Sequence, residues 1–277
     1  MNITLDKCSA RHPAAKSDAP DALKALGLNV SSGEQLAIIG PSGAGKTTLL
    51  HLLACALQPS GGTLEMNGRN PWALARRTLH ELRGELFLAP QVPPLPPRQR
   101  VITAVLAGRL PQEGFWASVR SLFYPNDIAL AEGALAQFDV SDKLFDRVDR
   151  LSGGERQRVG LARALASQAG LFLVDEPLSA LDPTRAQQAI ESLTQAARLR
   201  GATLVTTLHH VEMALQHFPR IIGLRDGALA FDLPAAQVTP ERLRQLYEQH
   251  LDELTGPSPT LIFDAPPTTR PVALTCR

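Results

Sequence analysis

The chain has 277 residues, of which 44% are hydrophobic and 20% are charged, a composition that excludes a disordered protein and provides enough apolar material for one large core. Its 28 basic and 27 acidic side chains nearly cancel, which disfavours a nucleic-acid-binding protein, and its three cysteines lack the spacing of a metal site or a disulfide framework. Because no stretch approaches the roughly 18 consecutive apolar residues of a membrane span, and residues 1–10 lack the layout of a signal peptide, we expect a cytosolic chain.

The first part of the chain predicts strands and a helix around a glycine-rich loop. Residues 27–30 indicate a short strand, and the apolar run at 36–39 predicts a strand that is buried on both faces. Residues 48–57 are apolar enough for a buried helix, which we expect to end at the proline and paired glycines of 58–62. The pattern at 63–68 then predicts a small hairpin.

The middle of the chain predicts a block of helices between strands. Helical patterns, with little strand signal, occupy residues 101–110, 128–138 and 155–167. Two later apolar runs, at 171–174 and 203–207, predict buried strands that are each followed by a helical pattern, as in a parallel sheet wrapped by helices. We therefore expect an α/β core into which a helical subdomain is inserted.

A glycine-rich motif lies between the buried strand at 36–39 and the helix that follows it. The motif G-x-x-x-x-G-K-[ST], which forms the phosphate-binding loop of many NTPases, is matched by Gly40, Pro41, Ser42, Gly43, Ala44, Gly45, Lys46 and Thr47. Its glycines allow the backbone to curl so that N–H groups and the helix N-terminus face phosphate oxygens. We expect Lys46 to reach the β- and γ-phosphates and the Thr47 hydroxyl to ligate Mg²⁺. The alternative, a glycine-rich turn that only caps a helix, is disfavoured by motif and position together.

Two carboxylates follow the buried strand predicted at 171–174. Asp175 and Glu176 would lie at the C-terminal edge of the sheet, where open α/β folds bind ligands. Asp175 is suited to ligate Mg²⁺, directly or through water, since this cation prefers oxygen ligands. Glu176 is suited to polarise the attacking water as a general base. Alone, an apolar run followed by Asp-Glu would indicate only a strand that leaves the core, but the phosphate loop favours the catalytic interpretation.

The sequence from Leu151 to Glu155 resembles the signature sequence of ABC ATPases, and it is the most discriminating motif in the chain. Ser152 and Glu155 also form a capping box for the helix that follows, which is a structural alternative. That alternative does not explain the consecutive Gly153 and Gly154, which weaken a helix start unless the backbone must approach something closely. In the family, the serine hydroxyl and the glycine N–H groups meet the γ-phosphate of ATP held by the other subunit.

The resemblance to ABC ATPases extends to four other residues. Gln91 matches the glutamine of the Q-loop, which contacts Mg²⁺ and the attacking water and joins the core to the helical subdomain. Asp182 matches the D-loop at the nucleotide, and His209 matches the switch histidine that contacts the γ-phosphate. His12 stands where the family usually carries an adenine-stacking aromatic residue, and an imidazole stacks less well than a tyrosine. Each residue also has a structural alternative when it is taken alone. Gln91 could be a surface amide, Asp182 an N-cap, and His209 an ordinary polar residue at a strand end.

Within the family, the resemblance is closest to the ATPase subunits of phosphonate-type importers. Three segments carry it: the loop at 40–48, the aromatic stretch at 115–124 and the run at 207–214. The loop match adds Thr48 to the expected nucleotide-binding residues.

The resemblance covers roughly residues 23–254 and implies a P-loop NTPase core of the ABC type. We expect one ABC ATPase domain at 1–254, with a small antiparallel β subdomain and a helical subdomain at about 92–166. Residues 255–277 are rich in proline and threonine, which predicts an irregular tail.

The resemblance also implies cofactors and partners. An ABC ATPase binds ATP and Mg²⁺, and it acts as a homodimer because one chain holds one phosphate loop and one signature while each site needs both. Ser152 and Gly154 of one copy would face Lys46 of the other. The expected partners are transmembrane permease subunits and a periplasmic binding protein, with the chain as a peripheral subunit at the cytoplasmic face of the inner membrane. No nucleic-acid partner is expected.

Two other functions compete with this interpretation. An exporter or a lipoprotein-release ATPase would carry the same motifs, because the membrane partners and binding proteins select the substrate. A soluble ABC-type ATPase of chromosome maintenance or translation is disfavoured, because no long heptad run separates Lys46 from Ser152 and the chain holds only one cassette.

Overall fold

The computed structural model describes residues 1–12, 14, 19–114, 116, 118 and 127–248. The predicted tail at 255–277 lies outside the described residues, and so does most of the aromatic stretch at 115–124. None of the described helices is long and apolar enough to cross a membrane.

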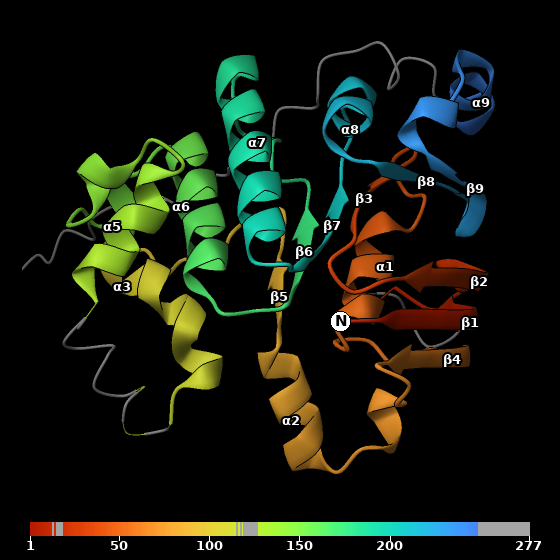
Figure 1. Ribbon diagram of the computed structural model, residues 1–277, viewed down its shortest axis with the longest axis horizontal. Helices are drawn as coiled ribbons and strands as arrows, with labels where there is room; N and C mark the ends of the chain where they lie inside the picture. The colour runs from red at the N-terminus through yellow and green to blue at the C-terminus, as the bar shows by residue number, and fades with distance from the viewer. Residues whose placement is uncertain (13, 15–18, 115, 117, 119–126, 249–277) are drawn as a thin grey trace, which may run out of the picture.

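A six-stranded sheet forms the centre of the molecule, in the order β5-β6-β7-β3-β8-β9 (Figure 1). Its strands are β3 (Gln35–Ile39), β5 (Leu86–Ala89), β6 (Leu171–Asp175), β7 (Thr203–Thr207), β8 (Arg220–Arg225) and β9 (Ala228–Pro234). All neighbouring pairs are parallel except β8 and β9, which form an antiparallel hairpin. The strands predicted at 36–39, 171–174 and 203–207 are therefore confirmed as parallel members of one sheet.

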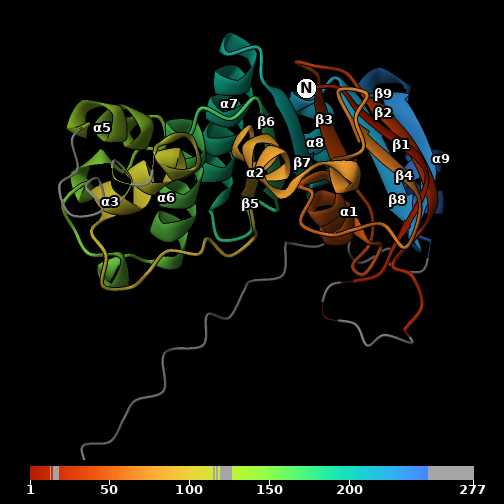
Figure 2. The same ribbon diagram turned by 90° about the horizontal axis from the view of Figure 1, so that it is seen from below.

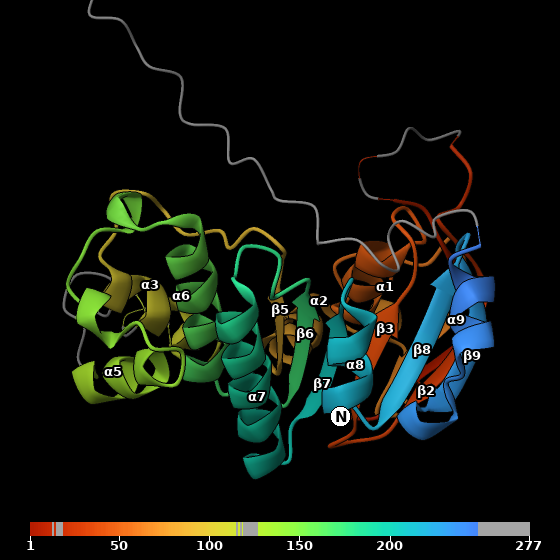
Figure 3. The ribbon, with the colours of Figure 1, turned by 90° about the horizontal axis from the view of Figure 1, so that it is seen from above.

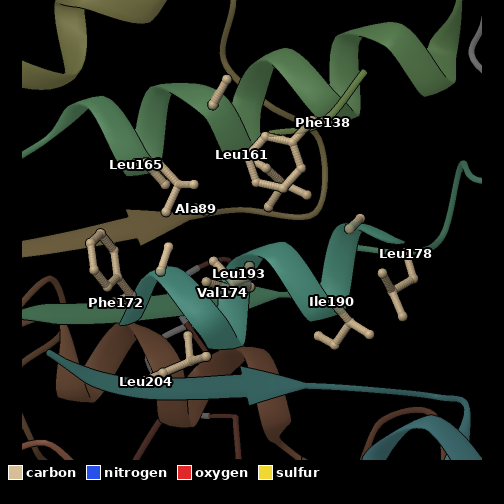
Figure 4. Packing of buried hydrophobic residues seen from close by; sticks show 14 of the residues in the cluster. Ala89, Phe138, Leu161, Leu165, Phe172, Val174, Leu178, Ile190, Leu193 and Leu204 are labelled. Carbon is tan, nitrogen blue, oxygen red and sulfur yellow. The ribbon is translucent and has the colours of Figure 1, made fainter. Parts of the chain in front are cut away.

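Helices cover both faces of this sheet (Figures 1 and 3). They are α1 (Lys46–Leu53), α2 (Arg76–Gly84), α6 (Gly153–Ala166), α7 (Pro183–Leu199), α8 (Val211–His217) and α9 (Pro240–Leu246), with short 3₁₀ turns at Pro71–Ala73 and Ala235–Gln237. Successive side chains of a strand point to opposite faces, so β6 contributes Leu171 and Leu173 to the core with α1, and Phe172 and Val174 to the core with α6 and α7. Figure 4 shows this second core, where Phe172 and Val174 lie among leucines of α6 and α7.

A second, three-stranded antiparallel sheet packs against α1, in the order β2-β1-β4 (Figure 2). Its strands are β1 (Ile3–Ala10), β2 (Leu23–Val30) and β4 (Gly61–Met66). This is the predicted antiparallel β subdomain, and the strand expected at 27–30 is the second half of β2. The hairpin expected at 63–68 is wrong, because β4 pairs with β1 and the turn after it closes only one bridge, between Met66 and Arg69.

Two boundaries of predicted elements also differ. The helix predicted at 48–57 begins earlier, at Lys46, and ends at Leu53, because Ala54 and Cys55 leave the helical conformation. Gly61 and Gly62, expected to break the chain, lie inside β4. A Cβ at Gly62 would stand 2.2 Å from the Lys7 carbonyl oxygen, so the glycine permits a close approach of two strands.

The helical subdomain stands at the β5 edge of the sheet (Figure 1). It contains α3 (Val101–Leu106), α5 (Ile128–Ala136), the start of α6 and 3₁₀ turns at Ala107–Gln112, Ser141–Lys143 and Val148–Arg150. The helices predicted at 101–110 and 128–138 are confirmed but shorter, and the one predicted at 155–167 begins at Gly153. Arg158 of α6 donates to the carbonyl oxygens of Phe138 and Asp139, which ties the end of α5 to α6.

Candidate functional site

The phosphate loop joins the C-terminal end of β3 to the N-terminus of α1. Three of its glycines have positive φ: Gly40 (154°), Gly43 (78°) and Gly45 (99°). A Cβ at Gly40 would lie 2.0 Å from the Leu224 carbonyl oxygen, and one at Gly45 would lie 2.7 Å from that of Ala22. A Cβ at Gly43 would meet nothing within 4 Å, so the loop is open there. The sequence therefore folds into a curled backbone that only glycine permits at these positions.

Lys46 is folded back on this loop. Its side chain is only 5% exposed, and Nζ donates to the carbonyl oxygens of Gly40 (2.7 Å) and Pro41 (3.1 Å). Ser42 and Gly43 are exposed, whereas Pro41, Ala44 and Thr48 are buried. A buried cation beside an exposed curl of backbone is suited to bind a polyanion.

Asp175 accepts hydrogen bonds from two threonines. Thr47 Oγ1 donates to Asp175 Oδ2 over 2.8 Å, and Thr207 Oγ1 donates to Oδ1 over 2.6 Å. Burial raises the pKa of the Asp175 carboxyl, an effect that the two hydrogen bonds and Lys46 oppose and the neighbouring Glu176 reinforces. The Thr47 hydroxyl and the Asp175 carboxylate thus bring hard oxygen donors together, and this set fits Mg²⁺.

The carboxylate of Glu176 is held on both sides. Gln91 Nε2 donates to Glu176 Oε2 over 2.6 Å, and His209 Nε2 lies 2.5 Å from Oε1. The Glu176 N–H donates to Thr207 Oγ1 over 2.9 Å. Glu176 has a φ of 47°, which is rare for residues other than glycine. The structure therefore brings the three predicted catalytic residues into direct contact, at the carboxyl ends of β5, β6 and β7.

The signature segment forms the start of α6. Ser152 Oγ accepts from the Glu155 N–H (3.3 Å) and Glu155 Oε2 accepts from the Ser152 N–H (2.7 Å), so the capping box is present. A Cβ at Gly154 would lie 2.9 Å from the Ala180 carbonyl oxygen. The need for glycine at Gly154 thus has a reason within the chain, in addition to the expected approach to a nucleotide.

Asp182 is the N-cap of α7. Its Oδ1 accepts from the Arg185 N–H over 3.1 Å, and Pro183 occupies the first helical position. The structural alternative for Asp182 is therefore confirmed, and its role at a nucleotide stays a prediction.

His12 lies in the connection between β1 and β2, with an exposed ring whose Nδ1 accepts from the Ala14 N–H over 3.1 Å. The last residue of the same connection, Ala22, packs against Gly45 of the phosphate loop. Stacking of His12 on adenine stays a prediction.

Two residues that support the site, Thr207 and Gly227, were not predicted from the sequence. Thr207 bonds both the Asp175 carboxylate and the Glu176 N–H. The sequence signal that could have identified it is a polar residue at the end of a buried strand, and in the sheet Thr207 pairs with Asp175. Gly227, in the turn between β8 and β9, donates its N–H to the Ala44 carbonyl oxygen over 3.1 Å and so contacts the phosphate loop.

The proline-rich segment after Gln91 packs on the signature helix. A Cβ at Gly160 would lie 2.6 Å from Pro93 Cγ, and Arg163 Nη1 donates to the Pro94 carbonyl oxygen over 3.3 Å. Beside this contact a small groove of about 80 Å³ opens between β5 and α6. The proline-rich segment therefore connects Gln91, which bonds Glu176, to helix α6.

A family match and the similarity to known proteins agree with this geometry. The family described as "ABC transporter" matches residues 23–179, more than half of the chain. The chain belongs to the ABC transporter family. As a member of this family it is an ATP-binding protein and an ATPase, and the predicted fold class is confirmed.

The ABC transporter relatives include full-length matches. The chain is 74% identical, over 100% of both chains, to "Phosphonates import ATP-binding protein PhnC" of Polaromonas sp. (strain JS666 / ATCC BAA-500). It is 50% identical to "Phosphonates import ATP-binding protein PhnC 2" of Pseudomonas aeruginosa (strain UCBPP-PA14), over 93% of this chain and 96% of that protein. Among solved structures, the dimeric bacterial ABC transporter cassette MJ0796 is 26% identical, with a TM-score of 0.72, over 84% of this chain and 98% of that one.

Proposed function

We propose that this ABC transporter chain is the ATP-hydrolysing subunit of an importer for phosphonates or related small anions. The observation that carries the proposal is the 74% identity, over the full length of both chains, to a protein named as a phosphonate import ATP-binding subunit. The contacts of Glu176 with Gln91 and His209 support the hydrolytic part of the proposal, because they set a carboxylate beside the phosphate loop.

In this proposal the phosphate loop and Lys46 bind the phosphates of ATP. The exposed N–H groups around Gly43 face the phosphate oxygens, and Lys46 exchanges the carbonyl oxygens of Gly40 and Pro41 for the β- and γ-phosphates. The buried ammonium already lies on the loop, so only its side chain needs to move. His12 stacks on the adenine.

Thr47, Asp175 and Gln91 would hold Mg²⁺, and the bound ion would neutralise charge that develops on the phosphates. Glu176 accepts a proton from the attacking water, and His209 orients Glu176 and contacts the γ-phosphate. The N–H of Glu176 and the hydroxyl of Thr207 keep that carboxylate at the strand end.

The active unit is a homodimer. The signature residues of one copy, Ser152, Gly153 and Gly154, complete the site at the phosphate loop of the other, with Asp182 at the junction of the two copies. The dimeric MJ0796 cassette is a family member with a similar fold, which supports this arrangement. ATP shifts the equilibrium between the open and the closed dimer toward the closed dimer, because it binds the closed dimer better.

The remaining partners are transmembrane permease subunits and a periplasmic binding protein, with the chain bound peripherally at the cytoplasmic face of the membrane. Movement of α6 reaches the permease through the segment around Pro93, which packs on Gly160.

The test is ATP hydrolysis by the assembled transporter. The chain would be reconstituted in lipid vesicles with the permease subunits and binding protein encoded in the same genome, and hydrolysis measured with 2-aminoethylphosphonate, phosphate or sulfate on the binding protein. Stimulation by the phosphonate, absent in Lys46→Ala, is expected. Stimulation by sulfate with none by the phosphonate would contradict the proposed substrate class.

A further inference from the structure

A buried tyrosine at the end of the last described helix contacts the first residue of the phosphate loop. Tyr247 directly follows α9, its side chain is 1% exposed, and its hydroxyl accepts a hydrogen bond from the Gly40 N–H over 3.1 Å. The two residues are 207 positions apart in sequence. The contact is therefore made by the tertiary fold, and it ties α9 to the nucleotide loop.

The position of α9 is well defined. Its N-cap Thr239 accepts from the Arg242 N–H, and Pro240 stands at the first helical position. Leu246 is buried in the same core as Phe172 and Val174. At the other end, Arg225 of β8 donates to the Gln245 carbonyl oxygen (2.5 Å) and lies 3.3 Å from Glu248 Oε2. Figures 1 and 3 show α9 beside the end of β8.

Gly40 is held from both of its backbone polar groups. Its N–H donates to Tyr247, and its carbonyl oxygen accepts from Lys46 Nζ over 2.7 Å. Gly40 has a φ of 154°, and a Cβ there would lie 2.0 Å from the Leu224 carbonyl oxygen, so no residue with a side chain fits at this position. A buried N–H needs a partner, so the Tyr247 hydroxyl stabilises the loop in this conformation.

We propose that Tyr247 is a positioning residue for the ATP site. Its hydroxyl keeps Gly40 in place when the Lys46 ammonium leaves the Gly40 carbonyl oxygen for the phosphates of ATP. This inference rests on the function proposed for Lys46 and the phosphate loop. It makes α9 a part of the nucleotide site, because the Tyr247 hydroxyl helps to fix the position of the first loop residue.

The test compares two single hydroxyl deletions. Tyr247→Phe keeps the ring in the core and removes only the group that faces Gly40. Thr194→Val is the matched control: it removes a buried hydroxyl that bonds the Ile190 carbonyl oxygen in α7 and does not face the loop. Both variants remove one buried, hydrogen-bonded hydroxyl, so both should lower the melting temperature by similar amounts.

Affinity for Mg·ATP separates the two. Measured by titration calorimetry in the Glu176→Gln background, Tyr247→Phe should bind ATP about 3- to 10-fold more weakly, because the freed loop must be reordered on binding. Thr194→Val should bind like its parent. With Glu176 intact, Tyr247→Phe should raise KM for ATP and leave kcat at saturating ATP unchanged.

Equal ATP affinity in Tyr247→Phe and its parent would overturn the proposal and leave the tyrosine a structural residue. If Tyr247→Phe did not fold, Arg225→Gln, which loosens α9 and keeps the hydroxyl, would decide: weaker ATP binding supports the proposal and unchanged binding overturns it. Failure of the parent to bind ATP would instead contradict the function proposed for the phosphate loop.

Discussion

His209 Nε2 lies 2.5 Å from Oε1 of Glu176, although the two residues follow different strands of the sheet. The other oxygen of the same carboxylate accepts from Gln91 Nε2. The carboxylate that we propose as the general base is thus oriented from two sides by side chains that come from segments far apart in sequence.

Removal of the histidine should disturb this orientation. We expect His209→Ala to lower kcat for ATP hydrolysis by about 10- to 100-fold, because a misplaced base accepts the proton from water poorly. ATP binding should persist, since the phosphate loop is intact. His210→Ala, which changes the adjacent exposed histidine, is the control and should retain kcat. A His209→Ala enzyme with full kcat would remove His209 from the mechanism.

Asp175 should show a conflict between stability and function. Because burial raises the pKa of its carboxyl, this group stabilises the folded, nucleotide-free protein fully below its unfolded pKa, and that stabilisation is lost as pH rises through the folded pKa. Asp175→Asn cannot ionise, so near about pH 7.5 it should melt about 2–4 °C above the unchanged protein, and the difference should shrink toward about pH 4. Thr47 and Thr207 can reorient their hydroxyls to bond the amide.

The same Asp175→Asn variant should lose Mg²⁺-dependent hydrolysis by about 100-fold or more, because a carboxylate ligand is replaced by a neutral amide. Thermal melts over a pH series and a magnesium titration of activity measure both effects. A variant that is less stable than the unchanged protein at neutral pH would show that the ionised carboxylate is stabilising.

Gly154→Ala should weaken the signature segment. The new Cβ would lie 2.9 Å from the Ala180 carbonyl oxygen, so the backbone must shift, at a cost of about 1–3 kcal/mol in the free energy of unfolding. Hydrolysis should also fall, because the start of α6 moves. Gly133→Ala is the matched control: nothing lies within 4 Å of its Cβ, so this helix should gain about 0.5–1 kcal/mol and activity should stay unchanged. Denaturant unfolding of the two variants measures the difference, and equal stabilities would contradict the close packing at Gly154.

The core elements could be predicted because strong local signals mark them. Continuous apolar runs identified β3, β6 and β7, and a site residue follows each strand within two positions: Gly40, Glu176 and His209. Strand β1 was missed because Lys7, with a φ of 46°, interrupts its alternation and shifts its register. The hairpin of β8 and β9 had a signal that was overlooked, the Asp226-Gly227 turn.

Contacts between distant segments could not be predicted in the same way. The resemblance to ABC ATPases implied that Glu176, Gln91 and His209 act at one site, but not that Gln91 and His209 would each contact a different oxygen of Glu176. The contact of Tyr247 with Gly40 has no local sequence signal, because it depends on where α9 packs in the finished fold. Nothing in the sequence around Gly160 marks it as special, but a glycine is needed there because Pro93 leaves no space for a Cβ.

We propose that Glu176 activates the water that hydrolyses ATP, in a site completed by a second copy of the chain. The most direct measurement is the rate of Mg²⁺-dependent ATP hydrolysis against protein concentration, with Glu176→Gln as the comparison. We predict a rate that rises more steeply than linearly, a loss of about 100-fold or more in the variant, and an ATP-dependent dimer of that variant. A rate that is linear in protein concentration and unchanged in Glu176→Gln would contradict the claim.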